Sequence, residues 1–261
     1  EDGGQMALED GGYAGGYLVG SGICAALILI AMLPVIARIF LCFKREENRF
    51  ARTVFHSGVH ICLVHGIFAS VFVAVMGAQL AELVGWDNGE VVAKMLQGGS
   101  AAIGLAALSC YFGRFLHAMG KRFAVLVAAC AADTLFLVVV LPSIGKIGIL
   151  SLVYGGVAGT AVLCILLGMS AFRQMRVRVD WLGILVVPLG AGGAAGLVCL
   201  LIGKVLSPHL GSLATLLVAF AVSGAVDWAV LLLLRNFKEQ ELEAVPGGRL
   251  IGMLGQLLHV R

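Results

Sequence analysis

Two carboxylates stand inside long apolar runs of this sequence, where charged side chains are rare. Asp133 lies in AACAADTLFLVVV, and Asp227 lies in FAVSGAVDWAVLLLL. A carboxylate at the centre of a membrane helix costs about 2.5–3.5 kcal/mol on insertion scales, so such residues usually face a bundle interior or an aqueous cavity. Each residue is therefore a candidate site for a cation, a proton or a lipid head group, or it hydrogen-bonds to a neighbouring helix. We expect Asp133 to face the protein interior.

Arg38 is the third candidate for binding a substrate or ion. It lies in LPVIARIF, near the end of an apolar run that a basic segment follows. Its guanidinium can contact an anionic phosphate, or it can extend to the membrane surface while its stem stays in the apolar region. The second arrangement is the commoner one for Arg at helix ends, and we favour it.

The histidines and the motif search point away from metal and covalent chemistry. His56 and His60 are four residues apart and share a helix face, but no carboxylate or thiol completes a set of metal ligands. We therefore interpret them as packing residues near the membrane surface. Since the sequence also has no phosphate-binding loop, HExxH or nucleophile elbow, we expect neither an enzyme nor a bound metal or cofactor.

The elements that carry these residues are predicted to be membrane-spanning helices. The chain has 261 residues, of which 60% are hydrophobic and 13% charged, against roughly 25% charged in a soluble domain. The apolar runs are continuous, and about 20 such residues cross a bilayer as a helix. Because backbone polar groups in lipid must be paired internally, the sequence predicts an all-α, polytopic helical bundle.

About seven spans are predicted, with a polar segment at each end. The 36 glycines include Gly192 and Gly196, whose four-residue spacing lets membrane helices approach closely. Residues 1–16 form an expected exterior, Gly-rich lead-in. In the tail, 235–261, apolar residues from Leu250 to Leu258 recur at helical spacing, which predicts an amphipathic helix on the membrane surface. The predicted spans cover residues 17–43, 53–86, 91–112, 123–145, 147–172, 181–203 and 210–234.

Lys and Arg alternate between rich and poor loops along the chain. The rich segments are residues 44–52, 114–122, 173–178 and 235–238, and the loops between them hold few basic residues. By the positive-inside rule the rich segments are cytoplasmic. The sequence therefore predicts an amino end outside and a carboxyl end in the cytoplasm.

The order of these features resembles a known transporter family. A Gly-rich first run leads into LPVIARIF and KREENRFAR, and HSGVHICLVHGIFASVFVAVMGAQLAELVGW and LQGGSAAIGLAALSCYFGRFLHAMGKR follow; RNFKEQELEAVPGG begins the tail. This pattern resembles the carboxyl-terminal half of stage V sporulation protein B-like proteins. They belong to the multidrug/oligosaccharidyl-lipid/polysaccharide exporter superfamily, which includes lipid II flippases. The resemblance implies that the spans are the eighth to fourteenth helices of a two-lobed protein whose amino-terminal lobe is missing here.

The resemblance also implies a function and a location. It implies a bacterial cytoplasmic membrane protein that translocates an undecaprenyl-linked saccharide, such as a peptidoglycan or polysaccharide precursor, by alternating access between two lobes. The implied partners are the lipid-linked saccharide, membrane lipids and the missing lobe, with no nucleic acid, and Na⁺ or H⁺ is the candidate coupling cation. Without the opposing lobe, this chain is not expected to transport alone.

Two alternatives stay open, and the type of cavity distinguishes them. A cation-coupled multidrug-type exporter should have a mostly apolar cavity with a carboxylate that binds a cation. A non-transporting scaffold subunit should have no cavity. A polar, Arg-containing cavity between lobes would instead favour the flippase.

Overall fold

The computed structural model describes residues 48–84, 89–175, 182–207 and 209–234. These ranges are helical throughout, apart from short turns, and contain no strand, so the predicted all-α fold is confirmed. A short π-helical turn, Leu182–Val186, leads into α7. The helices are α2 (Asn48–Val84), α3 (Gly89–Gly99), α4 (Ala101–Ala118), α5 (Arg122–Ile147), α6 (Leu150–Met175), α7 (Val187–Leu206) and α8 (Ser212–Leu233).

Within the described ranges, six helices are long and apolar enough to cross a membrane. They are Phe55–Leu83, Ala101–Ala118, Arg122–Ile147, Leu150–Met175, Ile184–Leu206 and Ser212–Leu233. The chain is thus a multi-pass membrane protein with a helical bundle, as predicted. The predicted first span at 17–43, the lead-in at 1–16 and the tail with its amphipathic helix at 235–261 lie outside the described residues.

The predicted third span, 91–112, is divided between two helices. Helix α3 ends at Gly98-Gly99, and a turn at Ser100 separates it from α4; glycine and serine are weak helix formers. The membrane-crossing helix therefore starts at Ala101. It continues to Ala118 because Phe115 and Leu116 are buried, so the apolar face extends past the exposed Arg114.

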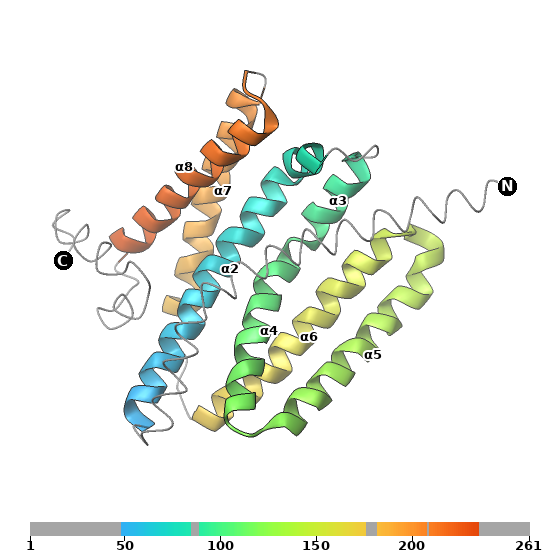
Figure 1. The fold of residues 1–261 in the computed structure, drawn as a ribbon, viewed down its shortest axis with the longest axis vertical. Helices are drawn as coiled ribbons and strands as arrows, with labels where there is room; N and C mark the ends of the chain where they lie inside the picture. The colour runs from blue at the N-terminus through green and yellow to red at the C-terminus, as the bar shows by residue number, and fades with distance from the viewer. Residues whose placement is uncertain (1–47, 85–88, 176–181, 208, 235–261) are drawn as a thin grey trace.

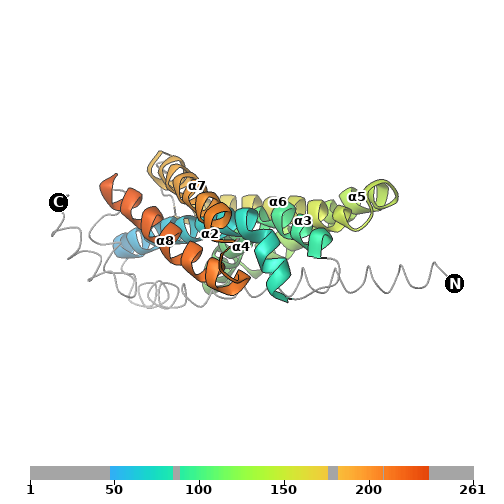
Figure 2. The same ribbon diagram turned by 90° about the horizontal axis from the view of Figure 1, so that it is seen from above.

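The helices form a nearly flat layer with α2 near its centre, as Figures 1 and 2 show. Helix α2 packs against α3, α4, α7 and α8. The hairpin of α5 and α6 forms one edge of the layer, where α6 contacts α4 and α5 contacts mainly α6. The layer therefore has α7 and α8 on one side of α2 and α4, α6 and α5 on the other.

An aromatic cluster joins the beginning of α2 to α4 and α6. Phe55 lies at its centre, with its ring centroid 4.6 Å from that of Phe115 and 5.6 Å from that of Phe172. The Tyr111 hydroxyl donates a hydrogen bond to the backbone oxygen of Phe55 at 3.1 Å. Gly58 lies against the Tyr111 ring, where a Cβ would overlap the phenol. This cluster fixes the end of the layer at which α2 begins.

Glycines set the close contacts that α2 makes at mid-layer. A Cβ on Gly66 of α2 would lie 2.9 Å from the Cα of Gly104 of α4. On α7, a Cβ at Gly192 would lie 2.7 Å from Ile67, and one at Gly196 would lie 2.6 Å from Val71. The predicted role of Gly192 and Gly196 in close helix packing is therefore confirmed.

Candidate functional site

The predicted site residues do not come together in the described part of the chain. Asp227 lies on α8 and is buried, with 3% of its surface exposed. Asp133 lies on α5, at the other edge of the layer, and its side chain is exposed. Arg38 lies outside the described residues.

The expectation that Asp133 faces the protein interior is wrong. Helix α5 has only one well-packed side, because it contacts mainly α6. On that side the neighbouring Ala132 is buried, and its backbone oxygen lies close to Gly159 of α6. Asp133 follows Ala132 in the helix and points away from this contact.

Asp227 belongs to a stripe of small and polar residues on α8. Thr215, Ala219, Ser223 and Asp227 recur every four residues, which places them on one helix face, and all four are buried. The Ser223 hydroxyl donates to the backbone oxygen of Ala219 at 2.5 Å. Helix α8 packs against α7 and α2, so this face is covered by protein.

The carboxylate of Asp227 has no visible partner along this stripe. Among the described residues, no hydrogen bond or ion pair reaches it. Trp228, the residue after Asp227, contacts His65 of α2, with the two ring centroids 5.8 Å apart. The Nδ1 of His65 lies 2.9 Å from the backbone oxygen of Ile61. Burial of an unpaired carboxylate lowers the stability of the fold. A stabilising role therefore does not account for the charge of Asp227.

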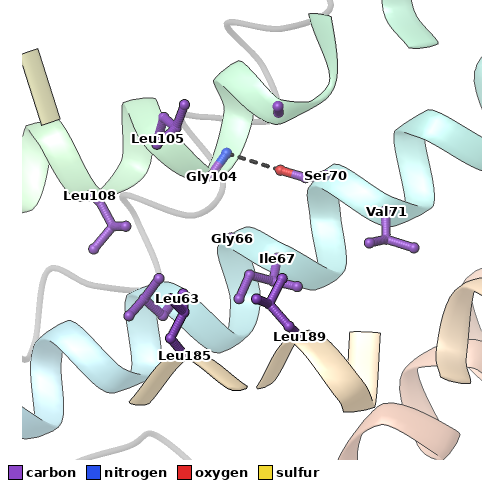
Figure 3. Close-up of a pocket in the computed structure, with 11 residues that line it drawn as sticks. Leu63, Gly66, Ile67, Ser70, Val71, Gly104, Leu105, Leu108, Leu185 and Leu189 are labelled. Carbon is purple, nitrogen blue, oxygen red and sulfur yellow. Dashed lines mark hydrogen bonds between the residues drawn. The ribbon is translucent and has the colours of Figure 1, made fainter. Parts of the chain in front are cut away.

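The second candidate feature is a groove between α4 and α7, which Figure 3 shows. Its volume is about 270 Å³, and α2 forms its floor. The lining residues are Leu63, Gly66, Ile67, Ser70, Val71, Ala101, Gly104, Leu105, Leu108, Leu185 and Leu189.

Packing at the two glycine contacts accounts for this groove. Gly66 and Gly104 bring α4 close to one face of α2, while Ile67 and Val71 pack into the glycines of α7 on another face. Leucines on these three helices and on the π-helical turn before α7 then surround the space that remains between α4 and α7. The Ser70 hydroxyl oxygen accepts a hydrogen bond from the backbone N–H of Gly104 at 3.2 Å, so the polar group in the groove wall is paired.

This chemistry suits a hydrocarbon chain better than a sugar. The groove is lined by aliphatic side chains and glycine, and no charged residue is among its lining residues. Neither Asp133 nor Asp227 belongs to the lining. The sequence did not predict the groove. The spacing of Gly66 and Ser70 indicates a close helix contact, but the leucines that line the groove are spread over α2, α4, α7 and the π-helical turn before α7.

The histidines that share a face of α2 have packing partners in the structure. His60 is buried, His56 is half-buried, and each interacts with other residues. Across the described ranges, no three His, Cys, Asp or Glu side chains converge as a metal site would require. The described residues thus offer no set of ligands built around this pair.

Comparisons of the chain with protein-family models, with curated proteins and with solved structures find no match. The class is therefore the one that the fold itself defines, a multi-pass helical membrane protein.

Proposed function

We propose that this chain is part of a flippase for an undecaprenyl-linked saccharide in a bacterial cytoplasmic membrane. The leucine-lined groove between α4 and α7 supports this proposal as a surface for the lipid tail. It is not the polar, Arg-containing cavity between lobes expected of a flippase, because no charged residue lines it. A lipid-linked saccharide carries a long isoprenoid tail, which needs an apolar surface while the head group crosses the membrane. In this proposal the groove holds part of that tail.

The saccharide head needs polar contacts that the groove lacks. We assign those contacts to a second lobe, against which the present helices move in alternating access. Arg38, in its less favoured role, would bind the phosphate. The reaction moves a substrate and changes no covalent bond, so the chain is a transporter subunit and not an enzyme.

The orientation in this proposal follows from the basic residues. Arg114, Lys121, Arg122 and Arg173 lie at the end of the layer where α4 and α6 finish and α5 begins. By the positive-inside rule this end faces the cytoplasm. The amino end is then outside, the tail is cytoplasmic, and the groove opens to the lipid between these two surfaces.

Photo-crosslinking of a polyprenyl phosphate with a diazirine in its tail tests the groove. The variant Ala101→Phe puts a ring into the groove wall, and Ala221→Phe adds the same ring to an exposed position of α8 that does not line the groove. We expect Ala101→Phe to lower crosslinking severalfold and Ala221→Phe to leave it unchanged. Equal crosslinking in both variants, or adducts confined to peptides outside α2, α4 and α7, would contradict the proposal.

Asp227 supports a second candidate function, that of a cation-coupled exporter. Its carboxylate is buried without a described partner, as a site that binds H⁺ or Na⁺ would be. The test, in vesicles that contain this chain together with the second lobe, is transport under an imposed H⁺ or Na⁺ gradient, compared between Asp227→Asn and Asp133→Asn. Loss of the response to the gradient in Asp227→Asn alone supports this function, whereas equal behaviour of the two variants excludes it.

A further inference from the structure

The end of the layer where α5 begins is rich in cationic side chains. Arg114 of α4, Lys121 and Arg122 at the start of α5, and Arg173 in the last turn of α6 are all exposed there. The described carboxylates lie elsewhere: Glu82 and Glu90 at the opposite end, Asp133 within α5 and Asp227 on α8. No described acidic side chain therefore neutralises these cations.

A groove between α5 and α6 opens at this end. Its volume is about 310 Å³, and it runs along the first turns of α5 and the last turns of α6. Phe123 is 77% exposed, Met169 57% and Val127 50%, so much of its wall is apolar and uncovered. Arg173 is the cationic residue that lines the groove.

The helix packing explains why the groove lies at this end. Near the opposite end, Gly155 and Gly159 of α6 let the two helices approach, with Gly155 against Val140 and Gly159 against Ala132. Toward the basic end the hairpin spreads apart, and the end of α4 packs against both helices (Figure 1). Ala128 belongs both to this packed cluster and to the groove, so the groove is closed at the back and open toward the membrane.

We propose that the groove between α5 and α6 is a binding site for an anionic phospholipid. One acyl chain lies along Phe123, Val127 and Met169, and the phosphate lies against the guanidinium of Arg173. Arginine suits this role because its planar fork can donate two parallel hydrogen bonds to phosphate oxygens. Lys121 and Arg122 lie at the same level and add to the attraction for an anionic head group.

The positions of Arg173 and Phe123 along their helices indicate that the ligand is a lipid rather than a soluble phosphate. Arg173 is two residues from the end of α6, and Phe123 is one residue from the start of α5. The cation is therefore at the depth of lipid head groups, and the apolar wall extends from it toward the centre of the span. A free phosphate would use the cation alone and leave the apolar part of the groove empty. The site is separate from the groove proposed for the isoprenoid tail.

Brominated lipids provide a local test in the full chain. The variant Phe123→Trp places a reporter in the groove, and the unsubstituted chain supplies the background from the three native tryptophans. In vesicles containing equal amounts of the two lipids, brominated phosphatidylglycerol should quench this reporter more than brominated phosphatidylcholine. Adding Arg173→Gln should lower the preference about fivefold. Arg114→Gln, which removes an exposed arginine outside the groove, should preserve it.

Several outcomes would overturn the proposal. Equal quenching by the two lipids would show no site for an anionic head group, and quenching by neither would show that protein covers the groove. An equal loss in Arg173→Gln and Arg114→Gln would mean general attraction by surface charge. Displacement by soluble glycerol phosphate would mean a site for a free anion. If Arg173→Gln fails to fold, salt takes its place: the preference of the Phe123→Trp chain should fall as ionic strength rises, and a salt-independent preference would overturn the proposal.

Discussion

Gly104 has a packing role that Gly113, another glycine of α4, does not share. A Cβ on Gly104 would lie 2.9 Å from the backbone oxygen of Gly66 and 3.1 Å from the Ser70 Oγ. A Cβ on Gly113 would meet only Leu167 Cδ1, at 3.9 Å. One position on α4 is thus closed to any side chain by a neighbouring backbone, and the other has room for a methyl group.

We predict opposite effects of alanine at these two positions. Gly104→Ala should destabilise the protein by about 1–3 kcal/mol, because α4 must move away from α2. Gly113→Ala should stabilise it by about 0.5–1 kcal/mol, because alanine favours the helix. Thermal unfolding in one detergent, monitored by circular dichroism, measures the stability change of both variants. Equal melting temperatures for the two variants would contradict the close contact of α2 with α4.

The two carboxylates within the spans should also respond differently to neutralisation. Asp227→Asn removes a buried charge that has no described partner, so we expect the melting temperature at neutral pH to rise by roughly 2–4 °C. Asp133→Asn changes an exposed side chain and should alter the free energy of unfolding by less than about 0.5 kcal/mol. A functional carboxylate often costs stability, so a gain in stability with a loss of transport would agree with an ion-binding role for Asp227.

A lower melting temperature for Asp227→Asn would show that the carboxylate stabilises the fold. In that case Asp227 would have a structural partner in the folded protein. The same measurement on Asp133→Asn shows whether the removal of a negative charge from any span has a general effect in the detergent used.

At the scale of the helices, α3 carries an ion pair whose contribution to stability depends on pH. This helix lies outside the six candidate membrane spans. Lys94 donates a hydrogen bond to Glu90 Oε1 at 2.8 Å, one helical turn away. This hydrogen bond, together with the nearby positive charge, lowers the pKa of the Glu90 carboxyl below its ordinary value. Because the folded-state pKa is the lower one, the pair contributes to stability above the ordinary Glu pKa and loses that contribution as the pH falls through the lowered value.

We predict that Lys94→Gln raises the pKa of Glu90 toward its ordinary value. Both side chains are exposed, so the melting temperature at neutral pH should barely change. Carboxyl-carbon NMR of labelled glutamate, recorded during an acid titration of the two proteins, measures the shift. An unchanged Glu90 titration in Lys94→Gln would mean that the pair does not form in solution.

The helices themselves were the most predictable part of this protein. The continuous apolar runs predicted helices that the structure describes over 53–84, 123–145, 147–172 and 182–203, apart from a turn between α5 and α6, because lipid leaves a chain few other ways to pair its backbone. The third span was less predictable, since α3 has enough apolar residues to extend the run beyond the true helix start. The weak helix formers at Gly98–Ser100 were the signal in the sequence for a break.

The candidate sites were less predictable, because they depend on which helices are neighbours. A carboxylate in an apolar run is costly wherever it lies, so similar roles were predicted for Asp133 and Asp227 from the sequence. The structure separates them because α5 is at an edge of the layer and α8 packs against two helices. The groove on α2 draws residues from helices far apart in the chain, whose adjacency no local pattern encodes. The groove beside Arg173 lies within the α5–α6 hairpin, and it depends on how far these two helices spread apart.

At the scale of the whole molecule, the two ends of the layer differ in charge. Lys121 precedes α5 at the basic end, and Lys146 is exposed near the other end of the same helix. In a background without the seven native cysteines, we predict that Lys146→Cys reacts with an impermeant maleimide added to whole cells. Lys121→Cys should react only after the membrane is opened. Labelling of Lys121→Cys in intact cells would reverse the proposed orientation.

The central place of α2 also sets an order of assembly during synthesis. Helix α2 enters the membrane before α7, yet its Ile67 and Val71 fit against glycines of α7 that are made more than a hundred residues later. Until α7 arrives, that side of α2 is in contact with lipid or with some other helix. The α5–α6 hairpin can close as soon as it is inserted, since its two helices are adjacent in the chain. The nascent protein therefore completes one edge early, and its centre stays incomplete until α7 and α8 are in the membrane.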